Sequence, residues 1–267
     1  MKNNIKFKIR CSAIGQIMTD GSGVITEKQL ETIKVLSGKE KKTKLQEEKL
    51  KELIYKRDNP ELSATAKTYC KEWLIENYFG RRKEISNKYT EKGIEVEDES
   101  IEFLVDNNFL FAAEKNTERK TNEYMTGECD INQPKEIWDV KNVWSMFTFP
   151  IFETENKNKA YEWQAQGYME LYDKNDYKLA YILSNTPQYL IDKEIGYAFR
   201  DTEFLTENDY NKAVDKIMKN HIFDDIDPQN RVKIFEFKRD KQAIEKVKER
   251  VKACQNYIDS LILKFIK

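Results

Sequence analysis

The sequence has little of several residue types on which catalytic and metal sites often depend. Its four cysteines (Cys11, Cys70, Cys129, Cys254) lie far apart and form no C-x-x-C pair. Zinc sites and iron–sulfur clusters usually take ligands from close cysteine pairs, so we interpret these thiols as reduced, small apolar side chains. There is one histidine, His221, on which any Ser-His-Asp triad would depend. Hydrolytic chemistry is therefore expected to use carboxylates and lysine.

Long apolar segments and a strong net charge are also missing. No run approaches about eighteen apolar residues and the opening residues lack the apolar stretch of a signal peptide, so a cytoplasmic protein without membrane contact is expected. The formal net charge is −1, with 35% of residues charged. This balance does not point to nucleic-acid binding, although an acidic metal site can offset basic patches. Three basic segments, 39–44, 81–83 and 115–120, are candidates, but solvated faces are the preferred interpretation.

Aromatic residues are plentiful and indicate a folded core. The 267 residues include 14 Tyr, 14 Phe and 4 Trp, which supply apolar area to offset chain entropy. Without repeats or low-complexity linkers, one domain over residues 1–267 is the simplest prediction. We divide it into a helical part (about 1–85), a catalytic core (about 86–190), an insertion (about 190–230) and a closing strand and helix (231–267).

Hydrophobic periodicity and turn residues predict the elements. Helices are expected from a cap at Ser12 to Met18, within 27–57, and over 63–78, 90–106, 160–172 and 242–265. Strands are expected over 5–9, 124–131, 137–143, 179–183 and 232–237. This order predicts a mixed α/β core with a central sheet.

One carboxylate falls where the helical period demands an apolar residue. Ile94, Ile101 and Leu104 form a stripe at 100° per residue, and Glu97 lies within it. A carboxylate on the core side needs a partner, such as a metal ion. A frayed helix edge and a buried salt bridge are equally good explanations.

A second group of polar residues lies on the predicted hairpin. Asp139 and Lys141 share one strand face, and the turn over 132–135 returns Asp130 beside Asp139. Two close carboxylates repel unless a divalent cation neutralises them, and magnesium prefers oxygen ligands. Lys141 can orient or activate water, or stabilise charge on a phosphate. Chance alone gives about eight acid-x-base triplets in a chain of this composition, so D-x-K by itself is weak evidence for a catalytic site. The G-x-x-D segment on the partner strand strengthens that evidence.

A third polar residue, Gln164, shares a helix face with Ala160, Gly167 and Leu171. Taken alone, an amide bonded to the sheet is the favoured interpretation. The combined order is Glu in a helix, G-x-x-D, D-x-K and Q-x-x-x-Y.

This order resembles the PD-(D/E)XK nuclease superfamily, and within it the YqaJ-like viral recombinases and lambda-type phage exonucleases. The resemblance implies a restriction-endonuclease-like core, in which a central mixed β-sheet is flanked by helices, with helical insertions. The segments that carry it are Arg10–Gly15, Lys92–Glu97, Gly127–Asp130, Asp139–Lys141, Gln164–Tyr168 and Val232–Leu263. Cys129 replaces the usual Pro, and the acid before Lys141 is Asp; both changes keep the carboxylates.

The resemblance assigns roles to single residues. The metal ligands would be Glu97, Asp130, Asp139 and the Val140 carbonyl, with Lys141 as the catalytic lysine. Gln164 would support that lysine or the water. Ser12 and Tyr168 are candidate DNA-binding residues, and so is Arg10, near the N-terminal motif, for which an ordinary surface arginine is an equally good interpretation.

The function implied is Mg²⁺-dependent hydrolysis of phosphodiester bonds at DNA duplex ends, with Mn²⁺ as a substitute, in phage-type homologous recombination. Expected partners are double-stranded DNA ends, a single-strand annealing protein and two further copies in a ring. An endonuclease of this superfamily, a non-catalytic DNA-binding protein with this fold, and a generic α/β protein stay open. The aromatics Trp144, Phe147 and Phe149 could stack on bases, although packing is the preferred explanation.

Overall fold

The computed structural model describes residues 5–19, 25–58, 61–84, 87–200 and 206–265. These residues form two compact units, which are described separately. The first comprises residues 1–83, 122–126 and 241–267, and the second comprises 84–121 and 127–240. The division between residues 83 and 84 lies near the end of the helical part proposed from the sequence, and the strand and helix over 231–267 fall in different units. The single-domain organisation stays a prediction.

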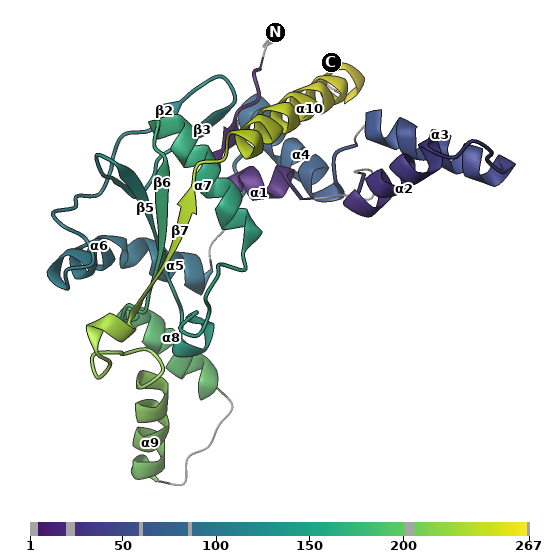
Figure 1. Cartoon of the computed structure of the whole chain (residues 1–267). Coiled ribbons are helices and arrows are strands. Elements are labelled where there is room, and N and C mark those ends of the chain that lie inside the picture. Colours follow the sequence, from purple (N-terminus) through teal and green to yellow (C-terminus); the bar gives the residue numbers. More distant parts are fainter. Residues whose placement is uncertain (1–4, 20–24, 59–60, 85–86, 201–205, 266–267) are drawn as a thin grey trace. The chain divides into compact units, whose positions relative to one another are not determined.

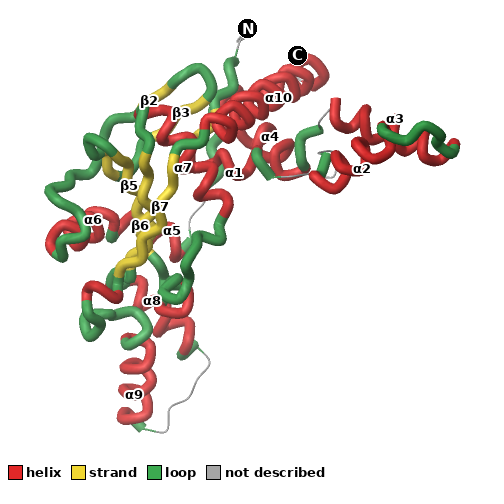
Figure 2. Tube along the Cα trace, in the orientation of Figure 1, coloured by secondary structure: helices red, strands yellow, loops and turns green. Residues whose placement is uncertain are grey.

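The first unit is mainly helical (Figures 1 and 2). Its helices are α1 (Ile14–Ile17), α2 (Glu27–Ser37), α3 (Lys44–Asp58), α4 (Ala64–Phe79) and α10 (Lys241–Phe265). Strand β1 (Ile9–Arg10) pairs in parallel with β3 (Met125–Gly127). Helix α4 has the predicted ends, because the Ser63 side chain caps it and Gly80 closes it with a φ of 65°. Ser12 does not cap a helix; it lies inside a 3₁₀ turn, Cys11–Ala13, that precedes α1.

The second unit contains a four-stranded mixed sheet. Its strands β4 (Ile131–Asn132), β5 (Glu136–Asn142), β6 (Asp176–Ile182) and β7 (Val232–Lys238) lie in that order. Strands β5 and β6 are parallel, and the other two pairs are antiparallel. The parallel pair requires a crossover, which helix α7 (Lys159–Tyr172) supplies. The predicted mixed α/β core is therefore confirmed.

The two faces of this sheet bury different side chains. Trp138, Val140 and Ala180 face a core that includes Ile101 and Leu104 of helix α6 (Glu97–Asp106). Residues of the opposite face, which carries Asp139 and Lys141, are contacted from α7. Figure 1 shows α6 and α7 on opposite sides of the strands. The remaining elements are α5 (Lys88–Glu95), β2 (Lys120–Thr121), η2 (Met146–Thr148), α8 (Gln188–Ala198), α9 (Glu207–Met218) and η3 (Pro228–Asn230).

Two predicted elements are interrupted. The helix expected over 90–106 breaks at Val96, whose φ of −100° and ψ of 10° separate α5 from α6. The strand expected over 124–131 is divided into β3 and β4, with residues 128–130 between them. Among the described helices, none is long and apolar enough to cross a membrane.

Candidate active site

Two carboxylates meet across the β4–β5 hairpin. Ile131 pairs with Trp138 in antiparallel register, which places Asp130, one residue earlier, opposite Asp139. The backbone N–H of Val140 donates to Asp130 Oδ2 at 2.7 Å. Burial, followed by the charge of Asp139, raises the pKa of Asp130 to about 8. The turn thus brings together the two acids that the sequence pairs.

Lys141 and Gln164 each contact Asp139, whose side chain is 1% exposed. Gln164 Nε2 donates to Asp139 Oδ1 at 2.7 Å, and Oδ2 forms an ion pair with the Lys141 ammonium. Burial lowers the pKa of Lys141, but the negative charges of Asp139 and Asp130 outweigh that effect and leave the pKa above its usual value. Lys141 is therefore held as a cation beside the carboxylates. Gln164 supports the acid rather than the lysine.

Glu97 lies at the start of α6 and has a different partner. Its Oε1 is 3.4 Å from Lys115 Nζ, which also lies 2.8 Å from Asp98 Oδ1. The negative charge of Glu97 still contributes to raising the pKa of Asp130, so the two acids are within electrostatic reach. The apolar stripe that singled out Glu97 does not hold, because Ile94 is 75% exposed and Val96 is buried instead. The break at Val96 means that residues before and after it do not follow one continuous helical period. Glu97 instead lies in the first turn of α6, where the helix dipole favours a carboxylate.

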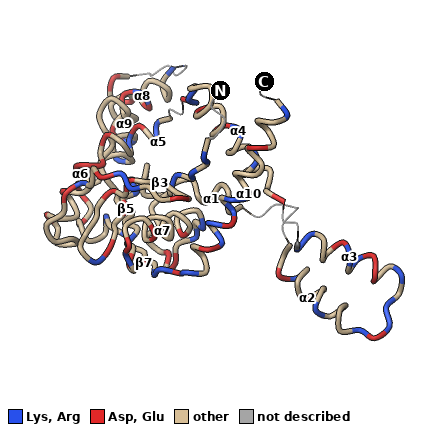
Figure 3. Tube along the Cα trace, turned by 90° about the horizontal axis from the view of Figure 1, so that it is seen from above, with Lys and Arg blue, Asp and Glu red and all other residues tan. Residues whose placement is uncertain are grey.

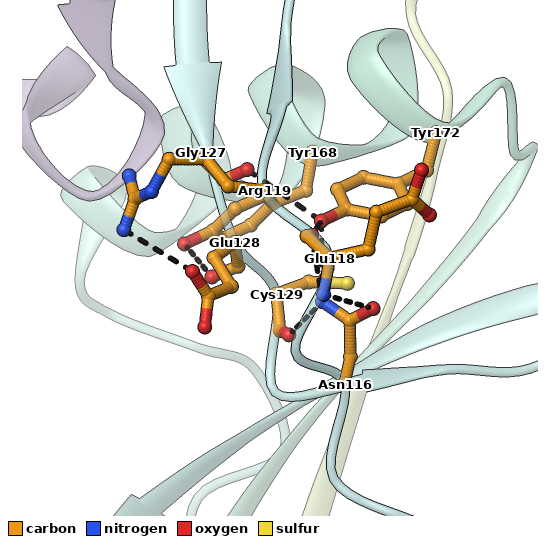
Figure 4. Close-up of polar contacts among 8 residues, drawn as sticks. All are labelled: Asn116, Glu118, Arg119, Gly127, Glu128, Cys129, Tyr168 and Tyr172. Atoms are coloured by element: carbon orange, nitrogen blue, oxygen red, sulfur yellow. Dashed lines mark hydrogen bonds and ion pairs between the residues drawn. The ribbon is translucent and has the colours of Figure 1, made fainter.

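A polar network fixes the segment that precedes Asp130 (Figure 4). Asn116 donates from Nδ2 to the Cys129 carbonyl at 2.9 Å, and its backbone N–H donates to the Asp130 carbonyl at 2.7 Å. Tyr168 donates to the Glu128 carbonyl at 2.9 Å, and Tyr172 donates to the Glu118 carbonyl. Backbone groups between β3 and β4 thereby gain partners that a continuous strand would have supplied.

The predicted DNA contact by Tyr168 is not favoured by its surroundings. Its side chain is 5% exposed, and its ring stacks on Tyr177 with centroids 6.4 Å apart. Its hydroxyl is bonded to the Glu128 carbonyl. Tyr168 is placed to hold the segment before Asp130 rather than to touch a ligand.

Sequence reasoning missed Tyr177 and Tyr161. Tyr177 lies on β6 opposite Ile137, on the face of Asp139. Its hydroxyl is buried, and burial and the charges of Asp139 and Asp130 raise its pKa. Tyr161, on α7, has its ring centroid 5.5 Å from Lys141 Nζ. The alternation of Tyr177, Leu179 and Tyr181 along β6 was the signal that could have placed Tyr177 beside the acids.

The donor set fits a divalent cation in part. No three Asp, Glu, His or Cys side chains converge as a metal-holding group among the residues that the structure describes. Asp139 is nevertheless buried with Lys141 as the partner of its Oδ2, and burial followed by the charge of Asp139 raises the pKa of the neighbouring Asp130. Two hard carboxylates of this kind suit magnesium.

The other predicted DNA-binding residues lie in the first unit. Arg10 Nη2 is 2.5 Å from Glu76 Oε1, and Ser12 is exposed. Two of the three basic segments are also paired with acids: Lys83 with Glu72, and Arg119 with Glu128, among others. Figure 3 shows acidic and basic residues interleaved along the chain. The interpretation of these segments as solvated faces is therefore supported.

The thiols and the single histidine lie in interior positions. All four cysteines are buried, and burial raises the pKa of Cys129 to about 12. His221 is also buried, with Nδ1 3.1 Å from Thr186 Oγ1 and its ring against Trp144. These surroundings agree with the prediction that carboxylates and lysine carry the chemistry.

The sheet, the crossover helix and the Asp130–Asp139–Lys141 group together define a nuclease core of the PD-(D/E)XK type. The chain is similar to a phage-related exonuclease from Haemophilus somnus 129PT, with 30% identity, a TM-score of 0.66 and 97% of each chain covered. It also shares its fold with the alkaline exonuclease LHK-Exo from Laribacter hongkongensis, at 10% identity and a TM-score of 0.57, covering 96% of this chain and 90% of that one. The same enzyme has been solved in complex with dAMP (12% identity, TM-score 0.57). No family profile and no curated protein sequence matches.

The chain therefore belongs to the family of phage-related exonucleases, the lambda-type, YqaJ-like branch of the PD-(D/E)XK nucleases. This confirms the family that the four-part motif order indicates.

Proposed function

We propose that this protein is a metal-dependent DNA exonuclease that hydrolyses phosphodiester bonds from duplex ends during phage-type recombination. The observation that carries the proposal is the apposition of Asp130 and Asp139 beside the Lys141 ammonium. Family membership supports the same reaction class. A ring-shaped trimer and a single-strand annealing partner stay predictions from the resemblance.

Asp130, Asp139 and the Val140 carbonyl would hold the cation, Mg²⁺ or Mn²⁺, with Glu97 joining from α6. When bound, such a cation polarises the scissile phosphate and lowers the pKa of coordinated water. The other roles fall to side chains of the second unit. Gln164 fixes the orientation of the Asp139 carboxylate through the 2.7 Å hydrogen bond.

Lys141 acts as a cation in this scheme. Its pKa is raised by the neighbouring acids, so the ammonium persists at neutral pH and stabilises negative charge that develops on the phosphate. Orientation or activation of the attacking water, the other role that the sequence leaves open for Lys141, stays a prediction beside charge stabilisation. The Tyr161 ring beside Nζ limits the directions from which a phosphate can approach.

The test is digestion of linear and closed circular duplex DNA with Mg²⁺, with Mn²⁺ and with EDTA. Loss of the linear form alone, abolished by EDTA, is the expected result. Cutting of the circle would favour an endonuclease. Retained DNA binding without cleavage in any divalent metal would refute the enzymatic proposal and favour a non-catalytic DNA-binding protein.

A further inference from the structure

Two phenylalanines on the segment between β5 and α7 are almost fully exposed. Phe147 is 92% exposed and Phe152 is 94% exposed. Burying a phenylalanine side chain is one of the larger gains available to a folding chain, so leaving two of them in water needs an explanation.

The exposure does not come from a loose segment. Residues Ser145 and Thr148 form reciprocal hydrogen bonds that cap the short helix η2, and the Glu153 N–H donates to the Pro150 carbonyl at 3.2 Å. Phe149 is 5% exposed and packs with Val143 and Leu183, and Ile151 packs on the same cluster. Phe149 and Ile151 are thus anchored inside, while Phe147 and Phe152 are held outside. For Trp144, Phe147 and Phe149 the sequence left base stacking and packing open. Packing accounts for the position of Phe149 but not for that of Phe147.

The segment is contiguous with the candidate active site at both ends. It follows the strand of Asp139 and Lys141 and precedes the helix of Gln164. Contacts also connect it across space: the Tyr161 ring near Lys141 Nζ meets the Tyr181 ring at 6.2 Å, and the Tyr181 hydroxyl donates to Asn156 Oδ1 at 3.5 Å. Six chain steps lead from Lys141 to Phe147, so their Cα atoms are at most about 22 Å apart. With the lengths of the two side chains added, and at about 3.4 Å of rise per nucleotide, the Phe147 ring lies within about ten nucleotides of a phosphate bound at Lys141.

We propose that Phe147 and Phe152 form a stacking surface for nucleobases of the DNA strand that enters the active site. This inference rests on the proposed function and deepens it. Base faces stack on aromatic rings whatever the sequence, which suits an enzyme that must process any strand. The same segment carries charged residues near the two rings in sequence, among them Glu153 and Lys157, which pair at 2.6 Å.

The test compares the double variant Phe147→Ala/Phe152→Ala with Phe111→Ala. Phe111 is also 92% exposed, but it follows Leu110, which packs with Trp138 on the opposite face of the sheet. The dissociation constant for a short labelled single strand is measured in EDTA, where cleavage is blocked. We expect the double variant to bind about a hundredfold more weakly, about tenfold for each ring, and Phe111→Ala to bind like the wild type. Replacing both rings with Trp should keep the affinity within about threefold.

The outcomes separate this inference from the function on which it rests. A double variant that binds as tightly as a wild type that digests DNA would refute the stacking surface alone. A wild type that neither binds nor cuts DNA would refute both. If the double variant keeps its affinity but sediments as a smaller species, the rings contact a second copy of the chain, and the inference is wrong.

Discussion

Replacing Gln164 with Leu tests whether this amide serves the reaction or only the fold. Gln164 is 4% exposed, and its Nε2 donates to Asp139 Oδ1 at 2.7 Å. Leu has a similar size but donates no hydrogen bond. The carboxylate of Asp139 would stay in place, held by Lys141, without the group that sets its orientation.

The expected magnitude follows from the type of bond. A hydrogen bond to a charged acceptor contributes about 1.5–3 kcal/mol, and about 1.4 kcal/mol corresponds to a factor of ten. If this bond positions Asp139 for the reaction, Gln164→Leu should lower kcat/KM by about 10- to 150-fold. The free energy of unfolding should fall by a similar 1–3 kcal/mol, because a buried oxygen loses its donor.

Gln166 provides a matched control in the same helix. It is also buried, its Nε2 donates to the Lys238 carbonyl at 2.9 Å, and its Oε1 accepts from the Asp240 N–H at 2.8 Å. Those bonds tie α7 to the end of β7 and not to an acid of the site. Gln166→Leu should therefore cost about 1–3 kcal/mol of stability while keeping kcat/KM per folded molecule near that of the wild type.

The assay combines urea unfolding with initial rates on linear duplex DNA, corrected for the folded fraction. Reduced rates in Gln164→Leu alone would support a positioning role. Equal rates in the two variants, with equal losses of stability, would refute the reasoning and leave Gln164 as an ordinary structural amide.

Three further predictions follow from the same unit. Asp139→Ala and Lys141→Ala should each abolish digestion of linear DNA while the far-UV circular dichroism spectrum stays unchanged. Burial, and then the charge of Arg231, lowers the pKa of Lys92 from 10.5 to about 7. Between pH 7 and 10.5 the unfolded chain then binds more protons, so the unfolding free energy of the wild type relative to Lys92→Met should rise by up to about 1.4 kcal/mol per pH unit. The buried Cys129, whose pKa is about 12, should resist alkylation at pH 8 until the protein is unfolded.

Each of these three predictions would be contradicted by a particular outcome. Wild-type rates in either alanine variant would mean that the site is misassigned. A pH-independent difference between wild type and Lys92→Met, measured against the exposed-lysine control Lys212→Met, would mean that the hydrogen bonds from Lys92 to the Val143 and Ser184 carbonyls offset its burial and leave it titrating as an ordinary lysine. Mass spectrometry that finds Cys129 modified in the folded protein would contradict its burial.

Local patterns in the sequence were sufficient to predict that Asp130, Asp139 and Lys141 lie together. Side chains alternate along any strand, so Asp139 and Lys141 had to share a face, and a short turn had to return Asp130 to its partner strand. The ends of helix α4 were equally predictable, because Ser63 and Gly80 act through their own backbone neighbourhood.

Other features depended on contacts between residues far apart in the chain. Glu97 faces Lys115 because a loop returns after α6, and the break at Val96 moved the apolar stripe away from the predicted positions. The surroundings of Tyr168 could not be predicted from the sequence of its own helix, because its hydroxyl donates to the carbonyl of Glu128, 40 residues away in the chain.

The sequence by itself determined the chemistry that the chain can offer: acids and a lysine at strand spacing, with no close cysteine pair and a single histidine. The tertiary structure alone decided which partners Glu97 and Tyr168 contact and which aromatic rings stay in water. Periodicity and short turns report only on neighbours within one element or one hairpin, whereas the ion pair at Glu97 and the outward position of Phe147 are set by packing between elements.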